Sequence, residues 1–454
     1  SNVALQILQH NDWVSLYRNQ ESLHFTKPPL TYWLIASSVS VFGYNEWAVR
    51  FPAALAFIFS VYLVFQLGKV FVPKRPWLPA LFFLSSPVTF FASNTVNTDT
   101  VLATMLTLAV TCYVQARFAG KNNYWLDAMW LAFGLAFLTK GPPALLPLLV
   151  ILIFNFWHKQ ARSLFRPLGI LAFMLVGLSW YLAVILRHPG LLDYFLGHEV
   201  YKRIATDEHN RNSEWYGAFK IYLPVLLFGL LPWIFVLLKQ KLSKSMVNEP
   251  TPLIQKQFLW LWFLLPLLIF SLSQSRMYLY ILWLFVPVFL LLAQKLQNWE
   301  FTHFSKFGII IWLVFLLSIK ALLPVLLDNH SKDSRAFAAD ITPMLPGHPN
   351  QIIFVEDMSR NGLNLYFQTN VKKVSFTKKP KPISDSAYDS SLLEELAQKP
   401  DNRIFIMKRD TEQSFLAELI KSNITPVKLG EWQEKTKPSD RDRMIYTLDG
   451  EFKP

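Results

Sequence analysis

Long apolar runs, each close to the length that crosses a bilayer, recur along the first 327 residues and then stop. Crossing a bilayer takes about 20 apolar residues, and slightly fewer where helices are kinked or partly buried in a bundle. Ten runs fit this description, so we expect about ten transmembrane helices. They cover approximately residues 46–72, 77–93, 99–117, 124–138, 142–157, 167–186, 218–238, 257–273, 278–295 and 306–327.

Basic residues gather in every second loop between these runs. The loops between, around Val96, Gly141 and Ser275, contain little charge beyond Lys140 and Arg276. Because lysine and arginine concentrate in cytoplasmic loops, the basic side is expected to be cytoplasmic. Residues 1–45, the loop 187–217 and residues 328–454 then share the external face. The basic loops contain Lys69, Lys74 and Arg75; Arg117 and Lys121; Lys159, Arg162 and Arg166; Lys239, Lys241, Lys244 and Lys256; and Lys295 and Lys306.

Residues 1–45 do not read as an ordinary spanning helix, because polar residues are frequent and Pro28 and Pro29 interrupt the segment. An apolar face is formed by Ala4, Leu5, Ile7 and Leu8, and Asp12 with Trp13 is expected to close the helix. This pattern predicts an interfacial helix with its tryptophan at the headgroup boundary. An amphipathic helix that merely packs against protein is the alternative.

Residues 328–454 are expected to form a soluble α/β domain. QIIFVE, NLYFQT, RIFIMK and RMIYTL read as strands, and SLLEELAQ and EQSFLAELIK read as helices. Asn361-Gly362 predicts a turn between the first two strands, and KKPKPISDS around Pro380 predicts an exposed loop. We find no nucleotide-binding glycine pattern and no nucleophile motif here. The predicted fold class is therefore a polytopic α-helical membrane protein with interfacial helices (1–45), a transmembrane region (46–327) and this C-terminal domain.

Composition and charge support this division. The chain is 52% hydrophobic, with 38 Phe and 16 Trp. Residues 331–454 contain 19 Lys and Arg against 18 Asp and Glu, so nearly all of the net charge of +13 belongs to the apolar part. This distribution argues against nucleic acid, whose partners cluster basic residues on a folded polar face. Cys112 is the only cysteine, which excludes an intrachain disulfide and a cysteine metal cage.

Lys27 is the first candidate for chemistry. It precedes Pro28 and Pro29 in HFTKPPL, and these prolines fix the chain direction and keep the lysine out of a helix interior. A lysine held at the membrane surface could bind a phosphate as a point charge. The alternative is a side chain that snorkels to lipid headgroups.

Asp99 lies in NTDT at the start of the third run. A carboxylate there could act as a general base or orient a substrate hydroxyl. Alone, an aspartate at a helix start more often caps backbone amides and complements the helix dipole.

The external loop 187–217 holds a dense group of charges. Such a run is usually solvated, and its histidines and carboxylates match no compact metal-ligand spacing. Lys202 and Arg203 are candidates for a lipid phosphate through charge-assisted hydrogen bonds. The group comprises His198, Glu199, Lys202, Arg203, Asp207, Glu208, His209 and Arg211.

Arg276 and Tyr280 stand four residues apart in SRMYLY, so on a helix they would share one face. The alternative is a pair of interfacial anchors. Lys140, in LTKGPP, is expected to be structural at a Gly-Pro helix break.

In order along the chain, NDW, FTKPPLTYWL, NEWAVRFPAAL, NTDT, FLTKGPPALLPL, WYLAV, GLLPW and SRMYLYILWLFVP form a recognisable set. This set resembles the bacterial aminoarabinose transferase branch of the protein mannosyltransferase superfamily, which has the GT-C membrane fold. The resemblance covers nearly all of residues 1–295, and SRNGLNLYF in the tail is similar to the external domain of that branch. Each motif alone is weak, whereas the ordered set is specific.

The resemblance implies an inverting glycosyltransferase that moves a sugar from a polyprenyl-phosphate carrier to an external acceptor, commonly lipid A. Such a site needs a base, or an anionic nucleophile, and cations for the leaving phosphate. Lys27 matches the family's phosphate-binding lysine, Tyr280 its tyrosine in the late external helix, and Asp99 its second functional aspartate. Lys202 and Arg203 match approximately the basic pair of the long loop, and Arg276 is expected near the same phosphate.

Three departures from the family pattern are visible. The family's Asp-Glu pair, which includes the expected catalytic carboxylate, and its first spanning helix would lie upstream of Ser1, where we expect further natural sequence. Thr26 replaces the glutamate before the lysine, and Val200 replaces the histidine ahead of the basic pair. Because those two positions supply the branch's metal site, we expect no metal and no other cofactor, and a different sugar or acceptor is open.

Rival functions remain at this stage. The acceptor could be a protein hydroxyl or a cell-wall glycan, and from another class the chain could be a transporter of lipid-linked sugars. A transporter more often shows internal repeats and charges near the bilayer midplane, and we find neither. The expected setting is a monomer in the bacterial inner membrane, with the C-terminal domain periplasmic and no nucleic-acid partner.

Overall fold

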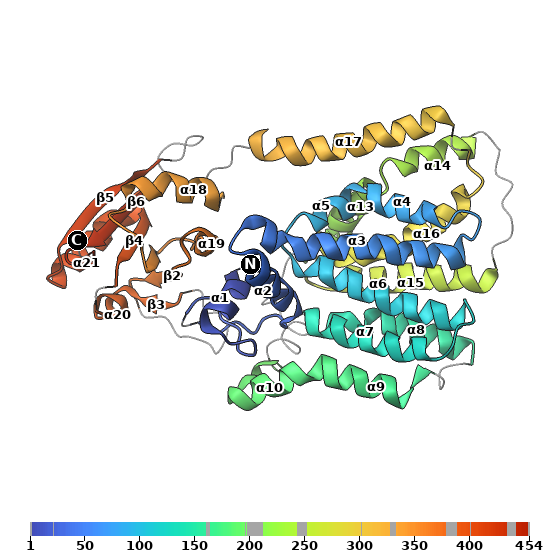
Figure 1. The fold of residues 1–454 in the computed structure, drawn as a ribbon, viewed down its shortest axis with the longest axis horizontal. Coiled ribbons are helices and arrows are strands. Elements are labelled where there is room, and N and C mark those ends of the chain that lie inside the picture. Colours follow the sequence, from blue (N-terminus) through green and yellow to red (C-terminus); the bar gives the residue numbers. More distant parts are fainter. Residues whose placement is uncertain are drawn as a thin grey trace. The chain divides into compact units, whose positions relative to one another are not determined.

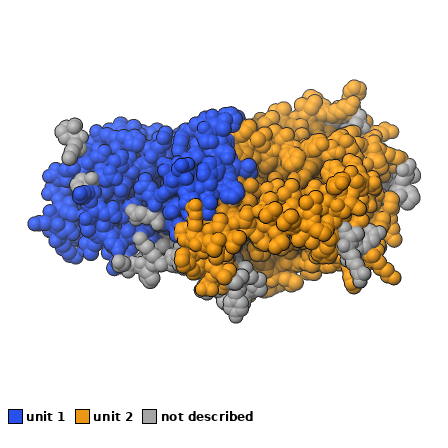
Figure 2. All heavy atoms as spheres, turned by 60° about the horizontal axis from the view of Figure 1, so that its bottom comes forward, with its two compact units in different colours: residues 1–26, 32–49, 321–454 blue, residues 27–31, 50–320 orange. Residues whose placement is uncertain are grey.

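The protein is described by a computed structural model covering residues 2–20, 22–159, 164–195, 197, 212–242, 252–300, 302–326, 333–377, 388–399, 401–433 and 442–452. The chain divides into two compact units, coloured separately in Figure 2. Unit 1 comprises residues 1–26, 32–49 and 321–454, and unit 2 comprises residues 27–31 and 50–320. Most of the N-terminal segment, for which we expected a domain of its own, is therefore grouped with the C-terminal residues.

All ten apolar runs are helical, and several are broken (Figure 1). Proline explains one break, because Pro87 opens α5 and its ring keeps the preceding Ser86 out of the helical conformation. The helices are α3 (Glu46–Phe71), α4 (Trp77–Ser85), α5 (Pro87–Ser93), α6 (Thr98–Arg117), α7 (Tyr124–Lys140), η1 (Pro142–Leu145), α8 (Leu146–Trp157), α9 (Pro167–Phe173), the π-helical η3 (Met174–Leu178), α10 (Ser179–Arg187), α11 (Leu191–Asp193), α13 (Gly217–Gly229), α14 (Trp233–Leu242), α15 (Leu253–Leu272), η6 (Tyr278–Leu284), α16 (Phe285–Leu296) and α17 (His303–Leu326).

Fewer than the ten expected helices have the length and composition needed to cross a membrane. Within the described residues, five helical stretches are long and apolar enough to cross a membrane: Glu46–Phe71, Thr98–Arg117, Pro167–Arg187, Leu253–Leu272 and Tyr278–Leu296. A sixth arises if α13 and α14, bent by 76° at their junction, count as one span. The structure is that of a multi-pass helical membrane protein, and the count of ten is not confirmed.

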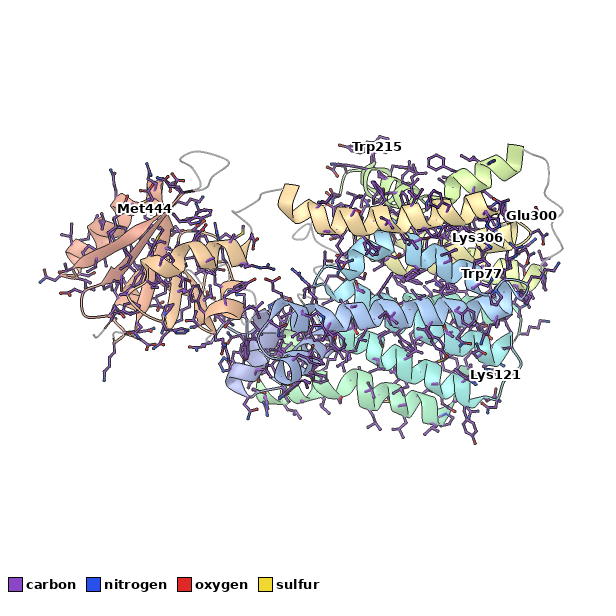
Figure 3. The ribbon with its side chains drawn as sticks, turned by 45° about the horizontal axis from the view of Figure 1, so that its top comes forward. Trp77, Lys121, Trp215, Glu300, Lys306 and Met444 are labelled. Atoms are coloured by element: carbon purple, nitrogen blue, oxygen red, sulfur yellow. The ribbon has the colours of Figure 1, made fainter. Side chains whose placement is uncertain are left out.

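Several basic loops lie at one end of the helices in unit 2. Figure 3 shows Trp77, Lys121, Glu300 and Lys306 gathered there. Arg75, in the loop before α4, donates a hydrogen bond to the carbonyl of Trp299 in the loop after α16. These loops are separated by more than 200 residues of sequence, and their meeting agrees with the alternation of loop charge.

Helix α6 lies in the core of unit 2. It packs against α7 and η6, and 83% of the residues in its most apolar 18-residue stretch are buried. Three of its buried threonines, Thr104, Thr107 and Thr111, each donate to the carbonyl four residues earlier. This local pairing lets a polar stripe sit inside an apolar bundle. A well-packed α6 fixes the position of the residues at its first turn.

In unit 1, the apolar face of α1 (Asn2–His10) packs against protein. Val3, Leu5 and Ile7 are buried in the protein, and α1 contacts α19 (Leu363–Phe367). Asn364 of α19 donates to the side chain of Asn2. The burial of these side chains in protein favours the packing alternative for α1, and the interfacial role of this segment stays a prediction. The helix ends at His10, next to the predicted Asp12 and Trp13.

The rest of unit 1 is a six-stranded sheet with strand order β3-β2-β1-β4-β6-β5. Strands β1, β2, β3 and β4 pair in parallel, and β6 is antiparallel to both β4 and β5. Apolar clusters cover both faces, which explains the continuous apolar runs in β1 and β4. The elements are α2 (Leu30–Phe42), α18 (Ser334–Ile341), η7 (Thr342–Met344), β1 (Gln351–Val355), β2 (Asn370–Ser375), β3 (Ser390–Ser391), α20 (Leu392–Leu396), β4 (Arg403–Lys408), α21 (Arg409–Lys421), β5 (Pro426–Trp432) and β6 (Arg443–Leu448).

Most predicted elements of this domain are confirmed, and NLYFQT is not a strand. It forms α19, which follows the turn at Asn361-Gly362 and ends at Gln368 in the left-handed conformation. The strand comes next, as β2, whose Lys372 is buried against Glu395 of α20. The KKPKPISDS loop lies outside the described residues.

Candidate functional site

Asp99 is in the first turn of α6, and it is not the residue that caps this helix. The capping residue is Asn97, whose side-chain oxygen accepts a hydrogen bond from the Thr100 N–H at 2.8 Å. The Asp99 carboxylate instead accepts from the Nζ of Lys140, forming an ion pair. Asn97, and not Asp99, therefore caps the helix. The side chain of Asp99 is directed at the Lys140 ammonium.

Lys140 is the last residue of α7, and its position depends on how that helix ends. Gly141 has φ +71°, a conformation that L side chains rarely adopt, and Pro142 and Pro143 follow it. The Lys140 ammonium also lies 4.3 Å from the centre of the Tyr280 ring. Such a cation over an aromatic face is electrostatically attractive.

Asp99, Lys140 and Tyr280, from α6, α7 and η6, therefore form one group, the polar cluster. The side chains of Lys140 and Asp99 are 13% and 15% exposed. Helix α6 has 20 residues and so is about 30 Å long. Asp99 at its start is therefore about that far from the end that leads to Lys121 and the basic loops. The sequence names Asp99 and Tyr280 as candidates and predicts a structural role for Lys140.

Arg276 and Tyr280 do not share the face of one α-helix. Met277 is extended, and η6, which begins at Tyr278, is a 3₁₀-helix. The i, i+4 spacing therefore does not place the two side chains on one helix face, because Arg276 precedes the helix. Tyr280 is nonetheless brought to the polar cluster by η6.

Arg276 is buried and forms a clamp between two chain segments. Its Nη1 donates to the carbonyls of Asn212 at 2.6 Å and Glu214 at 2.9 Å. Its Nε and Nη2 donate to the carbonyl of Ser271 at 3.2 and 3.0 Å. Four of the five guanidinium protons are thus directed at backbone, which leaves one Nη2 proton and the positive charge for any ligand.

Lys27 belongs to unit 2 with residues 28–31, and its side chain is half-buried. Pro28 and Pro29 are buried, and α2 begins at the next residue. Thr26, which replaces a metal ligand of the resembled branch, hydrogen bonds through its Oγ1 to the Nε2 of His24 at 3.0 Å. The role of Lys27 remains a prediction.

Lys202, Arg203 and Val200 lie outside the described residues, so their roles also remain predictions. In the part of the chain that the structure describes, no group of three or more His, Cys, Asp or Glu residues could hold a metal ion. The expectation that no metal binds stays a prediction.

The fold defines the class: a multi-pass helical membrane protein with a C-terminal α/β domain. ArnT from Cupriavidus metallidurans, in its crystal structure bound to undecaprenyl phosphate, has the same fold, with a TM-score of 0.72 and 17% identity over 100% of this chain and 93% of that one. Residues 26–188 match the family of dolichyl-phosphate-mannose-protein mannosyltransferases.

Two curated relatives are aminoarabinose transferases. The chain is 31% identical over 306 residues to the undecaprenyl phosphate-alpha-4-amino-4-deoxy-L-arabinose arabinosyl transferase 2 of Pseudomonas fluorescens strain Pf0-1, covering 66% of this chain and 54% of the relative. It is 33% identical over 287 residues to transferase 1 of strain Pf-5, covering 61% and 50%. The chain thus spans about half the length of these relatives. The resemblance inferred from the ordered motifs is confirmed.

Proposed function

We propose that the protein is an integral membrane glycosyltransferase that moves a sugar from a polyprenyl-phosphate carrier to an acceptor in the cell envelope, such as lipid A. The reaction takes place on the external, periplasmic face of the bacterial inner membrane, where the C-terminal domain also lies. The observation that carries the proposal is the polar cluster, which places a carboxylate, an ammonium and a phenol at the helix ends remote from the basic loops.

The reaction requires the site to stabilise the leaving phosphate and to accept the proton of a hydroxyl acceptor. The acceptor oxygen attacks the anomeric carbon of the sugar, and the bond from that carbon to the phosphate oxygen breaks. The phosphate leaves with the bonding electron pair, so it needs cations and hydrogen-bond donors. If the nucleophile is a hydroxyl, its proton passes to a base. Inversion at the anomeric carbon follows from a single displacement.

Lys27, Lys202, Arg203, Arg276 and Tyr280 are proposed to surround the phosphate, and Asp99 to lie near the acceptor. Within this set, Lys140 is a positioning residue: it holds the Asp99 carboxylate and contacts the Tyr280 ring, so it links the acceptor side to the phosphate side. Arg276 contributes chiefly its charge, because most of its protons are used by the clamp.

The names of the relatives support a polyprenyl-phosphate donor, since they are transferases that use undecaprenyl phosphate-linked 4-amino-4-deoxy-L-arabinose. Thr26 and Val200 separate this chain from the metal-binding pattern of that branch, so we propose a reaction without metal or other cofactor. The enzyme is proposed to act as a monomer.

Transfer from a labelled polyprenyl-phosphate sugar in liposomes tests the proposal. The full-length protein is compared with Lys27→Ala and with Lys121→Ala, a matched loss of one lysine at the other end of the helices. We expect the first variant to lose at least about 90% of the transfer rate, since a charged contact to phosphate contributes about 1.5–3 kcal/mol, and the second to keep it. Undiminished transfer by Lys27→Ala would remove the lysine from the site. Identification of the envelope component that loses the sugar in a deletion strain separates lipid A from protein and glycan acceptors.

A further inference from the structure

Tyr222, on α13, is a buried side chain for which neither the motifs nor the polar cluster gives a role. Only 2% of the residue is exposed. Its hydroxyl is buried and has no hydrogen-bond partner among the residues that the structure describes. Burying a hydroxyl without a partner is unfavourable, and protein interiors usually supply one.

Tyr113 shows how the same bundle treats a purely structural tyrosine. It is buried to a similar degree, at 1% exposed, and its hydroxyl accepts a hydrogen bond from the Nδ2 of Asn155 at 2.6 Å. Tyr113 and Tyr222 are the two tyrosines of the described part of unit 2 that are this deeply buried. The Tyr113 hydroxyl has a partner built into the fold, and the Tyr222 hydroxyl has none within the described part of the chain.

The surroundings of Tyr222 indicate what the missing partner is. Helix α13 packs against η6 and α15, the elements on either side of Arg276. The positive charge of Arg276 acts electrostatically on the Tyr222 hydroxyl, and so does Tyr280. The clamp from Arg276 to Asn212 and Glu214 holds the segment that leads into α13. The hydroxyl therefore lies near Tyr280 and Arg276, two groups that are proposed to surround a phosphate.

We infer that the Tyr222 hydroxyl donates a hydrogen bond to a phosphate oxygen of the polyprenyl-phosphate carrier, and that this ligand supplies the partner that the described residues do not provide. The inference rests on the proposed function and adds a binding residue to its site. A phenol beside an arginine suits an anionic oxygen, because hydrogen bonds to charged acceptors are stronger than those between neutral groups.

The substitution Tyr222→Phe tests this inference, because a ligand-binding role and a structural role predict different effects on the stability of the ligand-free protein. Without ligand, the variant is expected to be at least as stable as the wild type, because it removes an unpaired buried hydroxyl and keeps the ring. With undecaprenyl phosphate, its affinity is expected to fall about 10- to 100-fold. The measurement is the shift of thermal unfolding of the purified full chain in detergent as undecaprenyl phosphate is added, since a ligand that binds the folded state raises the midpoint.

Undecaprenol, which lacks the phosphate, and inorganic phosphate, which lacks the chain, are measured in parallel, so that the shift is attributed to the right part of the carrier. Tyr62→Phe is the matched control, because Tyr62 is 53% exposed on α3. Equal shifts for Tyr222→Phe and the wild type would overturn the inference and leave the proposed function standing. Loss of stability in the ligand-free variant would also overturn it. If undecaprenyl phosphate does not shift the wild type, the proposed function fails, and the inference fails with it.

Discussion

The clamp made by Arg276 allows a quantitative prediction about the segment that leads into α13. In Arg276→Gln, a neutral side chain replaces a guanidinium that makes four hydrogen bonds to the carbonyls of Asn212, Glu214 and Ser271. Hydrogen bonds from charged donors contribute about 1.5–3 kcal/mol each, and glutamine can retain one or two neutral ones. Removing at least two charged bonds is therefore expected to lower the free energy of local opening by about 3 kcal/mol.

Hydrogen exchange of the purified protein in detergent measures this opening. The amide of Gly217 donates to the carbonyl of Glu214 at 2.7 Å, and that of Lys220 donates to Tyr216 at 3.0 Å, so both report on the segment. A loss of about 3 kcal/mol corresponds to roughly 100-fold faster exchange.

Lys220→Gln is the control for this experiment. It also removes one positive charge from the segment, but its salt bridge to Glu214 is long, at 3.6 Å, and both side chains are about half exposed. Such a pair contributes at most about 1 kcal/mol, so exchange should change little. If Arg276→Gln exchanges no faster than Lys220→Gln, the hydrogen bonds of the clamp do not hold this segment, and Arg276 serves the ligand alone.

Three further predictions concern other parts of the fold. Glu395→Gln removes a buried carboxylate that pairs with the ammonium of Lys372, 1% exposed, and should destabilise unit 1 by about 3 kcal/mol, measured by denaturant unfolding of the full chain. Gly141→Ala should cost about 2 kcal/mol because of its backbone conformation, and should lower transfer activity by moving the end of α7, which the liposome assay detects. Asp389→Asn weakens its ion pair with Arg18 and should speed proteolysis within residues 11–26 several-fold, whereas an unchanged cleavage rate would show that the pair does not hold this segment.

The amino-acid sequence predicts the helical runs well, because each is long and apolar, and it predicts their breaks poorly. The interruption at Ser86-Pro87 and the 76° bend between α13 and α14 divide apolar runs that hydropathy joins. Strands β1, β4 and β6 are predicted because they are continuous apolar runs. Strand β2 is missed because Lys372 and Lys373 interrupt its apolar pattern. Lys372 pairs with Glu395, 23 residues away, which the local sequence does not show.

The site shows the same limits for a different reason. Asp99 is a candidate because it opens a long apolar run, and Tyr280 because it lies in a motif of the resembled family. Lys140 is underestimated because the Gly-Pro sequence after it indicates a helix end, and local sequence does not show which groups a helix end will meet. The sequence offers no sign of Tyr222, because it lies in an apolar run; only its burial without a partner among the described residues distinguishes it.

Residues of the polar cluster lie where helices are interrupted, and this placement has a physical cause. Inside an apolar bundle a charge is costly unless it is paired or near water, so ionisable groups collect at helix ends. Asp99 follows the cap made by Asn97, Lys140 precedes the break at Gly141, and Tyr280 is in a 3₁₀ turn ahead of α16. Three separate interruptions must therefore coincide for the three side chains to meet. Because Lys140 contacts both of the others, changes in the end of α7 should alter the acceptor and phosphate sides of the proposed site together.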